Sequence, residues 1–213
     1  MTDAQSMSPV GHLYVIAAPS GAGKTSLVKA LLEQEPGVRF SVSYTTRKMR
    51  PTEVNGRDYH FVTHAQFEQM VAAGEFLEHA QVFDNYYGTA RAQVQQLLDQ
   101  GANVILEIDW QGAQQIRRVM PGCRSIFILP PSRAELERRL RGRGTDDETV
   151  IQRRLRDAAS DMSHWAEFDY VVVNADFDRA RAELQSIVLG QGTALRADRP
   201  DLQPLIRELL ARG

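Results

Sequence analysis

The sequence contains little cysteine, little lysine and no long apolar run. Cys123 is the only cysteine among 213 residues, so no intrachain disulfide can form, which fits a reducing compartment. No apolar stretch approaches the length of a membrane span, and the first ten residues lack the basic and apolar regions of a signal peptide. Lysine occurs only at positions 24, 29 and 48, and the formal net charge of −2 offers nucleic acid no broad basic surface. We therefore expect a cytoplasmic protein with neither a nucleic-acid nor a membrane partner.

The length and the alternation of apolar segments indicate an α/β fold. With 213 residues, of which 43% are hydrophobic and 24% charged, the chain suits one domain, or one domain with an inserted lobe. Apolar runs typical of strands occupy Leu13–Ala17, Val38–Ser43, Val104–Ile108, Ser125–Leu129 and Tyr170–Val173. Helical patterns occupy Lys24–Gln34, Ala92–Gln100, Gly112–Val119, Ser132–Leu140, Asp147–His164 and Phe177–Leu189. Strands separated by helices predict a mostly parallel sheet with helices on both faces and ligands at the carboxyl ends of the strands.

Residues 44–90 interrupt this alternation. Two short aromatic-rich segments at Arg57–Val62 and Phe76–Phe83 resemble strands, and a helix is predicted between them at about residues 65–73. The pair Asn55-Gly56 is typical of a tight turn. Because fewer than fifty residues make only a thin core, we interpret this segment as an inserted lobe rather than an independent domain.

The end of the chain has a different pattern. Residues 191–201 are polar, and an amphipathic helix is predicted after them. The apolar residues of this helix are Leu202, Leu205, Ile206, Leu209 and Leu210. The helix can dock on its own domain or on another subunit, so both a monomer and a homo-oligomer fit the pattern.

The segment from Leu13 to Leu27 combines an apolar strand, a small-residue turn and the start of a helix. The strict phosphate-loop pattern begins with glycine where this chain has alanine, and the alternative is a tight turn with a chance Lys-Thr pair. Successive backbone N–H groups in such a turn bind phosphate, and the helix N-terminus adds partial positive charge. Lys24 can reach the β- and γ-phosphates of a nucleoside triphosphate, and the Thr25 hydroxyl can ligate Mg²⁺. The predicted phosphate-binding residues are Ala18, Pro19, Ser20, Gly21, Ala22, Gly23, Lys24 and Thr25.

A second group of polar residues lies in and beside the inserted lobe. Arg47 and Arg50 follow a predicted strand, and Tyr59 and Tyr87 come later in the lobe. Guanidinium forks and phenol hydroxyls suit a second, dianionic phosphate group. Glu78 offers two acceptor oxygens that match the N1–H and N2–H₂ donors of guanine, whereas adenine has no donor at N1. The alternative is structural, because arginines at loop ends are often solvated and tyrosines pack small lobes.

Taken together, these motifs resemble those of bacterial guanylate kinases. Between about Gly11 and Leu189 the family's order is kept by Ser-Gly-Ala-Gly-Lys-Thr, Thr-Thr-Arg-x-x-Arg-Pro, Asn-Tyr-Tyr-Gly-Thr, Ile-Asp-Trp-Gln-Gly-Ala and Arg-Gly-Arg-Gly-Thr. The resemblance implies that the lobe binds GMP and that the GMP phosphate contacts Arg47, Arg50, Tyr59 and Tyr87. It also places around guanine the residues Ser43, Glu78, Thr89 and Asp109. By the same resemblance, Asn174 lies near the adenine or the ribose of ATP.

Two acidic residues lie at the carboxyl end of the apolar strand predicted at Val104–Ile108. Glu107 and Asp109 are separated by one residue, so both side chains point to one face of the sheet. At the carboxyl end of a strand they can orient a Mg²⁺-bound water or the base, and solvated strand-end acids are the alternative.

A glycine-flanked polar segment connects two predicted helices and suits a mobile lid at about residues 141–155. Arg139, Arg143 and Arg154 lie in and beside it. We interpret these arginines, with Lys24, as the catalytic residues, because positioned cations stabilise charge on a phosphoryl group during transfer.

The predicted enzyme is a guanylate kinase with a phosphate-loop parallel sheet flanked by helices, an inserted mixed β lobe and a helical lid. It transfers the γ-phosphoryl group of ATP to GMP with Mg²⁺, giving ADP and GDP, in purine nucleotide metabolism. Its domain is expected at residues 11–190, with the core at 11–43 and 91–190 and the GMP-binding lobe at about 44–90, and residues 191–213 form a tail.

Two other functions are weighed against this one. A guanylate-kinase-like module can bind phosphopeptides after losing catalysis, but the intact Gly23-Lys24-Thr25 sequence argues against that function. A phosphate-loop kinase acting on a phosphorylated sugar shares the loop, but Glu78 and the arginine pair would then have no evident purpose.

Overall fold

The structure is a computed structural model in which residues 11–82, 84–142 and 148–211 are described. The chain divides into two compact units. The lobe unit comprises Met1–Tyr14, Pro36–Leu106 and Gln111–Cys123, and the loop unit comprises Val15–Glu35, Glu107–Trp110 and Arg124–Gly213. Each unit is therefore built from segments that are far apart in the sequence.

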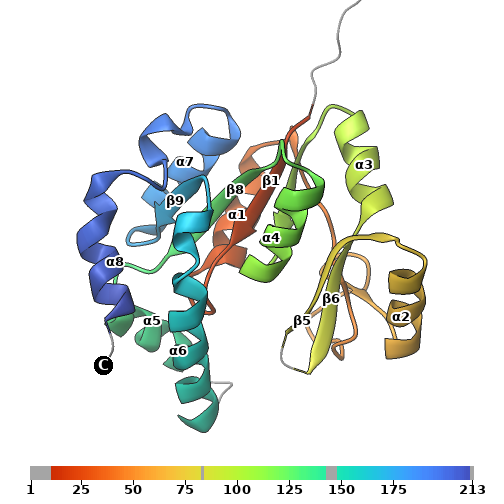
Figure 1. The fold of residues 1–213 in the computed structure, drawn as a ribbon, viewed down its shortest axis with the longest axis horizontal. Helices are drawn as coiled ribbons and strands as arrows, with labels where there is room; N and C mark the ends of the chain where they lie inside the picture. The colour runs from red at the N-terminus through yellow and green to blue at the C-terminus, as the bar shows by residue number, and fades with distance from the viewer. Residues whose placement is uncertain (1–10, 83, 143–147, 212–213) are drawn as a thin grey trace, which may run out of the picture. The chain divides into compact units, whose positions relative to one another are not determined.

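A five-stranded sheet has the strand order β2-β7-β1-β8-β9, of which β1, β8 and β9 are labelled in Figure 1. Two of its strands, β1 and β7, contain residues of both units. The strands are β1 (Leu13–Ala17), β2 (Val38–Phe40), β7 (Asn103–Glu107), β8 (Arg124–Leu129) and β9 (Tyr170–Val173). β2 pairs with β7 in parallel, as does β8 with β9. All five residues of β1 are buried, which its unbroken apolar sequence favours in a central parallel strand. The predicted α/β fold with a parallel sheet is confirmed.

Four helices of the loop unit are α1 (Lys24–Gln34), α5 (Arg133–Arg141), α6 (Glu148–Met162) and α7 (Phe177–Val188). The bounds of α1 are those predicted, and its buried residues pack toward α7. α5 begins after Ser132, whose hydroxyl accepts a hydrogen bond from the backbone N–H of Glu135. α6 ends two residues before the predicted end at His164, because the chain turns there into a 3₁₀ segment at Trp165–Glu167.

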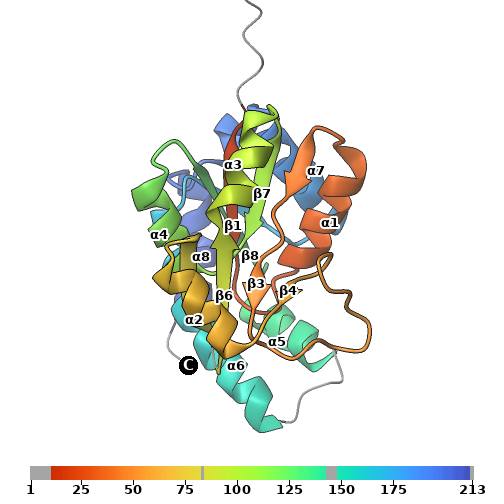
Figure 2. The ribbon, with the colours of Figure 1, turned by 90° about the vertical axis from the view of Figure 1, so that its right-hand side faces the viewer.

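A smaller mixed sheet forms the centre of the inserted segment, with the order β4-β3-β6-β5. Its strands are β3 (Tyr44–Thr45), β4 (His60–Phe61), β5 (Phe76–Val82) and β6 (Asn85–Ala90). β3 pairs in parallel with β4 and antiparallel with β6, and β5 pairs antiparallel with β6. Helix α2 (His64–Ala72), labelled in Figure 2, contacts β5. The rings of Phe67 and Phe76 stack with centroids 4.6 Å apart. The predicted mixed β lobe is thus confirmed.

The predicted strands beside and within the lobe differ in detail from the structure. The predicted strand Val38–Ser43 ends at Phe40, because the chain passes there from the larger sheet into β3 of the smaller one. Within the predicted strand Arg57–Val62, only His60–Phe61 form a strand, β4. Residues 57 and 58 belong instead to a turn that includes Gly56, whose φ is 80°. β6 was not predicted, because its polar and glycine residues lack strand-like apolar alternation. Helices α3 (Arg91–Asp99) and α4 (Trp110–Val119) each begin one or two residues before the predicted start.

The C-terminal tail docks on the loop unit itself, which is one of the two options that its pattern allows. It contains 3₁₀ segments at Gly192–Leu195 and Pro200–Leu202 and the helix α8 (Gln203–Leu210). The apolar face of α8 buries Ile206 and Leu209 and packs against α6 (Figure 1). The polar stretch before α8 is hydrogen-bonded to β9, since Arg199 Nη1 donates to the carbonyl of Val171 at 2.8 Å.

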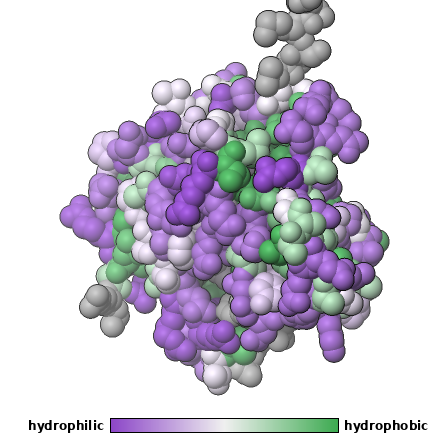
Figure 3. Space-filling view, turned by 45° about the vertical axis from the view of Figure 1, so that its right-hand side comes forward, coloured by the Kyte–Doolittle hydropathy of each residue, from purple (hydrophilic) through white to green (hydrophobic). Residues whose placement is uncertain are grey.

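Hydrophilic side chains dominate the face drawn in Figure 3, and its apolar side chains form only small groups. Exposed large apolar residues of the described chain are Met49, Val54, Val119, Val150, Phe177 and Leu189. Across the described ranges, no helix combines the length and the apolar character that crossing a bilayer requires.

Candidate active site

The predicted phosphate loop joins β1 to α1 in the loop unit. Gly21 and Gly23 both have φ of 94°, a left-handed conformation that side-chain-bearing residues rarely adopt. A Cβ atom on Gly23 would lie 2.4 Å from Asn174 Nδ2, so the close approach of this side chain also requires glycine. Both glycines of the sequence pattern are therefore needed for the turn, whereas Ala18, at the first position of the pattern, is half-buried just after β1.

The two polar residues that start α1 are bound to the carboxyl end of β7. Lys24 Nζ donates a hydrogen bond to the carbonyl of Ile108 at 2.8 Å. The Thr25 hydroxyl donates to the carboxylate of Glu107. A hydroxyl and a carboxylate oxygen thus meet beside a lysine at the start of the helix, and hard oxygen atoms of this kind are what Mg²⁺ prefers.

Asn174 and Arg139 hold the other side of the loop. Asn174 is 5% exposed, and its Nδ2 donates to the carbonyl of Ala22 at 2.8 Å. Arg139 Nη2 donates to the backbone carbonyl of Asn174 at 2.9 Å, and Nη1 to that of Ala22 at 3.4 Å. Arg139 Nε also bonds Glu135 at 2.7 Å. The structure therefore brings together the predicted ATP residue Asn174, the predicted catalytic Arg139 and the phosphate loop.

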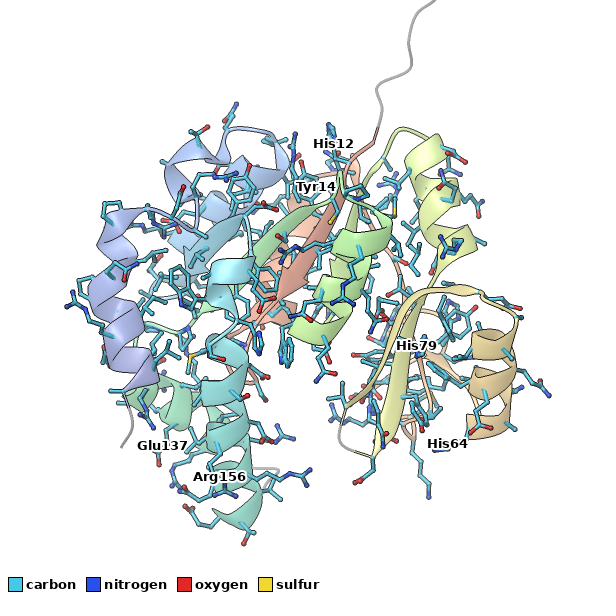
Figure 4. The ribbon with its side chains drawn as sticks, in the orientation of Figure 1. His12, Tyr14, His64, His79, Glu137 and Arg156 are labelled. Carbon is cyan, nitrogen blue, oxygen red and sulfur yellow. The ribbon has the colours of Figure 1, made fainter. Side chains whose placement is uncertain are left out.

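The other predicted lid arginines are less fully described. Arg143 lies outside the described residues. Arg154 is half-buried on α6. Other arginines here are engaged at the surface: Arg141 with Glu137 and Glu148, Arg138 with Glu135, and Arg153 with Asp157 at 3.9 Å. Hydrogen bonds from Arg138 and then Arg139 lower the pKa of Glu135 to about 2. Arg156, labelled on α6 in Figure 4, is exposed.

A cluster that the sequence reasoning missed lies beyond Lys24 in the same unit. Asp161 of α6 accepts a hydrogen bond from the Trp110 side chain and is close to Asp109 and Lys24. The Trp110 ring stacks on His164 with centroids 3.5 Å apart and an interplanar angle of 9°. Burial, followed by the Asp109 carboxylate, raises the pKa of Asp161 to about 6, against the opposing effects of Trp110 and Lys24. Only its place on the partly buried face of α6 could have indicated this aspartate.

In the lobe unit, two of the predicted guanine-reading residues lie on neighbouring strands of the smaller sheet. Glu78 of β5 is 3% exposed and pairs directly across the ladder with Thr89 of β6, which is fully buried. The Thr89 hydroxyl donates to Glu78 Oε1 at 2.5 Å. Ser43 is buried just before β3, where its carbonyl accepts from the N–H of His60 at 2.9 Å. A buried carboxylate oriented by a hydroxyl can accept hydrogen bonds from paired donors such as those of guanine.

The predicted phosphate-binding residues of the lobe surround an acid that the sequence reasoning missed. Arg47 donates from Nη2 and Nη1 to the two carboxylate oxygens of Glu53, at 2.7 and 3.0 Å. The backbone N–H of Arg50 donates to Glu53 Oε2 at 2.8 Å, while the Arg50 side chain is exposed. The Arg47 guanidinium lies 5.4 Å from the ring centroid of Tyr59, and the rings of Tyr59 and Tyr87 are 6.0 Å apart.

The Arg47–Glu53 contact changes the ionisation of both groups. The hydrogen bond with Glu53 is the largest effect that raises the pKa of Arg47, and burial opposes it. Tyr87 raises the Arg47 pKa further, which places that tyrosine near the guanidinium. The hydrogen bond from Arg47 lowers the pKa of Glu53. The pair therefore stays charged at neutral pH, and its only sequence signal is an acid six residues after the arginine.

The predicted site residues thus fall into two groups. Ser43, Arg47, Arg50, Tyr59, Glu78, Tyr87 and Thr89 belong to the lobe unit, and the phosphate loop, Asp109, Arg139, Arg154 and Asn174 belong to the loop unit. The first group combines guanidinium groups with a buried carboxylate, which suits a nucleoside monophosphate. The second combines a cation, an amide-lined turn and hard oxygen atoms, which suits a nucleoside triphosphate.

Comparisons with known proteins agree with this chemistry. A sequence model of the guanylate kinase family matches residues 10–191. The chain is 58% identical over 200 residues to a guanylate kinase of Alkalilimnicola ehrlichii, covering 94% of this chain and 98% of the relative. It is 53% identical over 203 residues to that of Escherichia coli, again covering 94% and 98%. A crystal structure of guanylate kinase from Anaplasma phagocytophilum aligns with a TM-score of 0.72 and 32% identity, covering 96% of this chain and 98% of that one.

Proposed function

The chain belongs to the guanylate kinase family, and from this premise we propose how its residues divide the work of phosphoryl transfer. The enzyme is an ATP:GMP phosphotransferase, since it shares 53–58% identity with curated guanylate kinases over nearly its full length. It binds ATP as donor and GMP as acceptor. The residue assignment rests on two hydrogen bonds, from Lys24 to the carbonyl of Ile108 and from Thr25 to the carboxylate of Glu107. They place a cation and oxygen ligands beside the phosphate loop.

The donor half of the reaction belongs to the loop unit. The backbone N–H groups of residues 18–25, apart from Pro19, which has none, hold the ATP phosphates, and Lys24 stabilises the negative charge that moves during transfer. Asn174 orients the loop through Ala22 and is placed by its family resemblance near the adenine or ribose. Because little covalent chemistry is needed, correct positioning and charge stabilisation account for most of the expected catalysis.

The residues beside Lys24 fit a magnesium ion. Thr25 offers a hydroxyl and Glu107 a carboxylate, and the two groups contact each other in the structure, so hard oxygen ligands already converge there. We assign Thr25 as the direct protein ligand and Glu107 as the group that orients it or a bound water. When bound, Mg²⁺ would neutralise charge on the ATP phosphates.

The acceptor half belongs mainly to the lobe unit. Glu78, oriented by Thr89, accepts from guanine N1–H and N2–H₂, and the buried Ser43 adds a second polar group for the base. Arg47 and Arg50, with Tyr59 and Tyr87, bind the GMP phosphate. Glu53 holds the Arg47 fork in a fixed orientation through two hydrogen bonds, which reduces the ordering cost when phosphate binds. Asp109 belongs to the loop unit and is assigned to the base by its family resemblance.

The lid arginines Arg139, Arg143 and Arg154 stabilise the negative charge on the phosphoryl group during its transfer from ATP to GMP. The test compares Arg154→Ala, at a half-buried position, with the control Arg156→Ala, at an exposed position on the same helix. We expect Arg154→Ala to lower kcat by ~10²-fold or more with small changes in KM, and Arg156→Ala to resemble wild type. A rise confined to the KM for GMP would assign Arg154 to ground-state binding instead.

A coupled assay with ATP and GMP, AMP, CMP or UMP in turn tests the acceptor assignment. We expect GMP to be preferred strongly, because an analogue without the paired donors leaves the buried Glu78 carboxylate unsatisfied. Similar kcat/KM values for GMP and AMP would contradict the assigned role of Glu78. The oligomeric state and a cytoplasmic location stay predictions, the second supported by the lone cysteine.

A further inference from the structure

Helix α4 places one glutamine against the backbone of β5 in the lobe unit. β5 lies at the edge of the smaller sheet, in which its neighbour is β6. Gln115 Nε2 donates to the backbone carbonyl of His79 at 2.8 Å, and the His79 N–H donates to Gln115 Oε1 at 3.1 Å. Figure 4 labels His79 on this strand. A glutamine side chain can make both contacts because its amide carries a donor and an acceptor, as the backbone of a neighbouring strand does.

These two hydrogen bonds lie beside an irregularity in β5. Phe76 pairs with Ala90 and Glu78 pairs with Thr89, so β5 has one residue more than β6 over this step, which is Leu77. Three successive residues, 76 to 78, are buried there, where a regular strand at the edge of a sheet would alternate. A bulge of this kind re-aims side chains and disturbs the hydrogen bonds of the ladder. Glu78 therefore lies next to the least regular part of its own strand.

Gln115 restrains β5 from the side opposite β6. Both backbone groups of His79 meet a partner outside the sheet, so they point away from β6. The His79 ring also packs near Phe67 and Phe76, with centroids 6.4 and 6.2 Å away. Because a shift of a strand by one residue turns every side chain to the other face, fixing His79 also fixes the face on which Glu78 lies.

We propose that Gln115 is a positioning residue for the choice of base, because its amide holds β5 at His79 so that the Glu78 carboxylate faces the guanine of GMP. Thr89 orients the carboxylate through Oε1 at 2.5 Å, whereas Gln115 holds the strand that carries it. This inference rests on the role given to Glu78 under the proposed function. Since a small misplacement of a binding group is costly, loss of the two hydrogen bonds weakens the contacts with guanine more than those with ATP.

Gln115→Met tests this role, because methionine keeps the length of the side chain and its preference for a helix but makes neither hydrogen bond. We expect kcat/KM for GMP to fall ~5- to 10-fold and the preference for GMP over AMP to narrow by a similar factor. The KM for ATP should stay within about twofold of wild type. Gln115→Glu should be impaired at least as much, because a carboxylate oxygen then faces the His79 carbonyl. Gln96→Met, at an exposed position on α3 of the same unit, should behave as wild type.

Hydrogen exchange at the His79 N–H measures the contact without using activity. This N–H should exchange slowly in the wild-type protein and at least ~10-fold faster in Gln115→Met. Equally fast exchange in both proteins would overturn the proposal. A lower Tm in Gln115→Met with the wild-type GMP/AMP ratio would also overturn it, since a contact that only stabilises the fold has that effect.

Glu78→Gln separates this inference from its premise. In a Glu78→Gln background, Gln115→Met should change the GMP/AMP ratio little further, since the carboxylate that it positions is gone. A narrowed ratio in Glu78→Gln beside a wild-type ratio in Gln115→Met would overturn the positioning role alone. An unchanged ratio in Glu78→Gln would instead refute the proposed role of Glu78. If Gln115→Met fails to fold, Gln115→Glu decides by the same comparison of ratios.

Discussion

The loop unit and the lobe unit hold their functional groups in different ways. In the loop unit, Lys24, Asn174 and Arg139 all donate to backbone carbonyls. In the lobe unit, Arg47 and Glu78 are held by other side chains, through Glu53 and Thr89. Main-chain carbonyls are present whatever the sequence, but a side-chain partner exists only where a particular residue is encoded. The main-chain contacts of Lys24, Asn174 and Arg139 should therefore survive substitution of the residues that accept them, while Arg47 and Glu78 need particular partners. The loop unit also contains side-chain pairs of this kind, Thr25 with Glu107 and Arg139 with Glu135.

The two units should also respond to mutation in different kinetic parameters. The loop unit holds the groups that meet developing charge, so damage there should lower kcat. The lobe unit holds the acceptor nucleotide in both ground and transition states, so damage there should raise the KM for GMP or change the choice of base. Three substitutions test this contrast, and a fourth tests the ionisation of Asp161 in the loop unit.

Lys24→Ala should have the largest effect. Lys24 is the only cation in the phosphate loop, so its removal should lower kcat by at least ~10²-fold without unfolding the protein. Steady-state kinetics and thermal unfolding measure the two quantities. Lys29→Ala, at an exposed position on the same helix, is the matched control. Activity of Lys24→Ala within a few fold of wild type would remove the loop unit from catalysis.

Glu78→Gln should act mainly on the choice of base. Glutamine keeps the shape of the side chain but replaces one acceptor by a donor, so one guanine hydrogen bond is lost and a donor then faces a donor. We expect kcat/KM for GMP to fall by ~10- to 10²-fold and the preference for GMP over AMP to narrow. Glu68→Gln, exposed on α2, should change neither value. An unchanged GMP/AMP ratio in Glu78→Gln would mean that guanine is read by Ser43, Thr89 or Asp109.

Asp161→Asn should change the pH dependence of stability in the loop unit. The pKa of Asp161 is raised to about 6, so the folded protein takes up this proton before the unfolded chain does. Ionised Asp161 therefore destabilises the fold above pH 6, by at most ~3 kcal/mol, and this cost disappears as the pH falls through 6 toward the ordinary value near 4. Asp161→Asn should raise Tm by a few degrees at pH 8 and by much less at pH 5. A Tm difference that is equal at both pH values would contradict the raised pKa.

Glu53→Gln should have the smallest effect, confined to phosphate binding in the lobe unit. One of the two acceptor oxygens facing Arg47 is lost, so we expect the KM for GMP to rise ~3- to 10-fold. AMP should be affected equally, because the phosphate is shared, and kcat should stay near wild type. The pKa of Glu53 is lowered, so the stabilising effect of the pair is complete above its ordinary value and is lost only at more acidic pH. A change in the GMP/AMP ratio would show that Glu53 acts on the base instead.

Much of the loop unit and several residues of the lobe could be predicted because their signals are local. The bounds of α1 follow from the apolar spacing after Lys24, and the turn before it follows from Gly21 and Gly23, whose backbone conformation few other residues can adopt. Arg47, Glu78 and Tyr59 were proposed from their side-chain chemistry taken together and from the resemblance to guanylate kinases, and their roles stay predictions. Strand β6 was missed because its polar residues are stabilised by pairing with β5 rather than by apolar alternation.

The sequence by itself determined the alternation of strands and helices outside the inserted lobe, the phosphate loop and the candidates for binding two nucleotides. Only the tertiary structure decided that Glu53 holds Arg47, that Thr89 orients Glu78 and that Asp161 meets Trp110. It also decided that the C-terminal helix packs on its own unit, where Ile206 and Leu209 are buried. The physical reason is that backbone conformation depends on neighbours in the chain, while side-chain partners depend on which distant segments the fold brings within hydrogen-bonding distance.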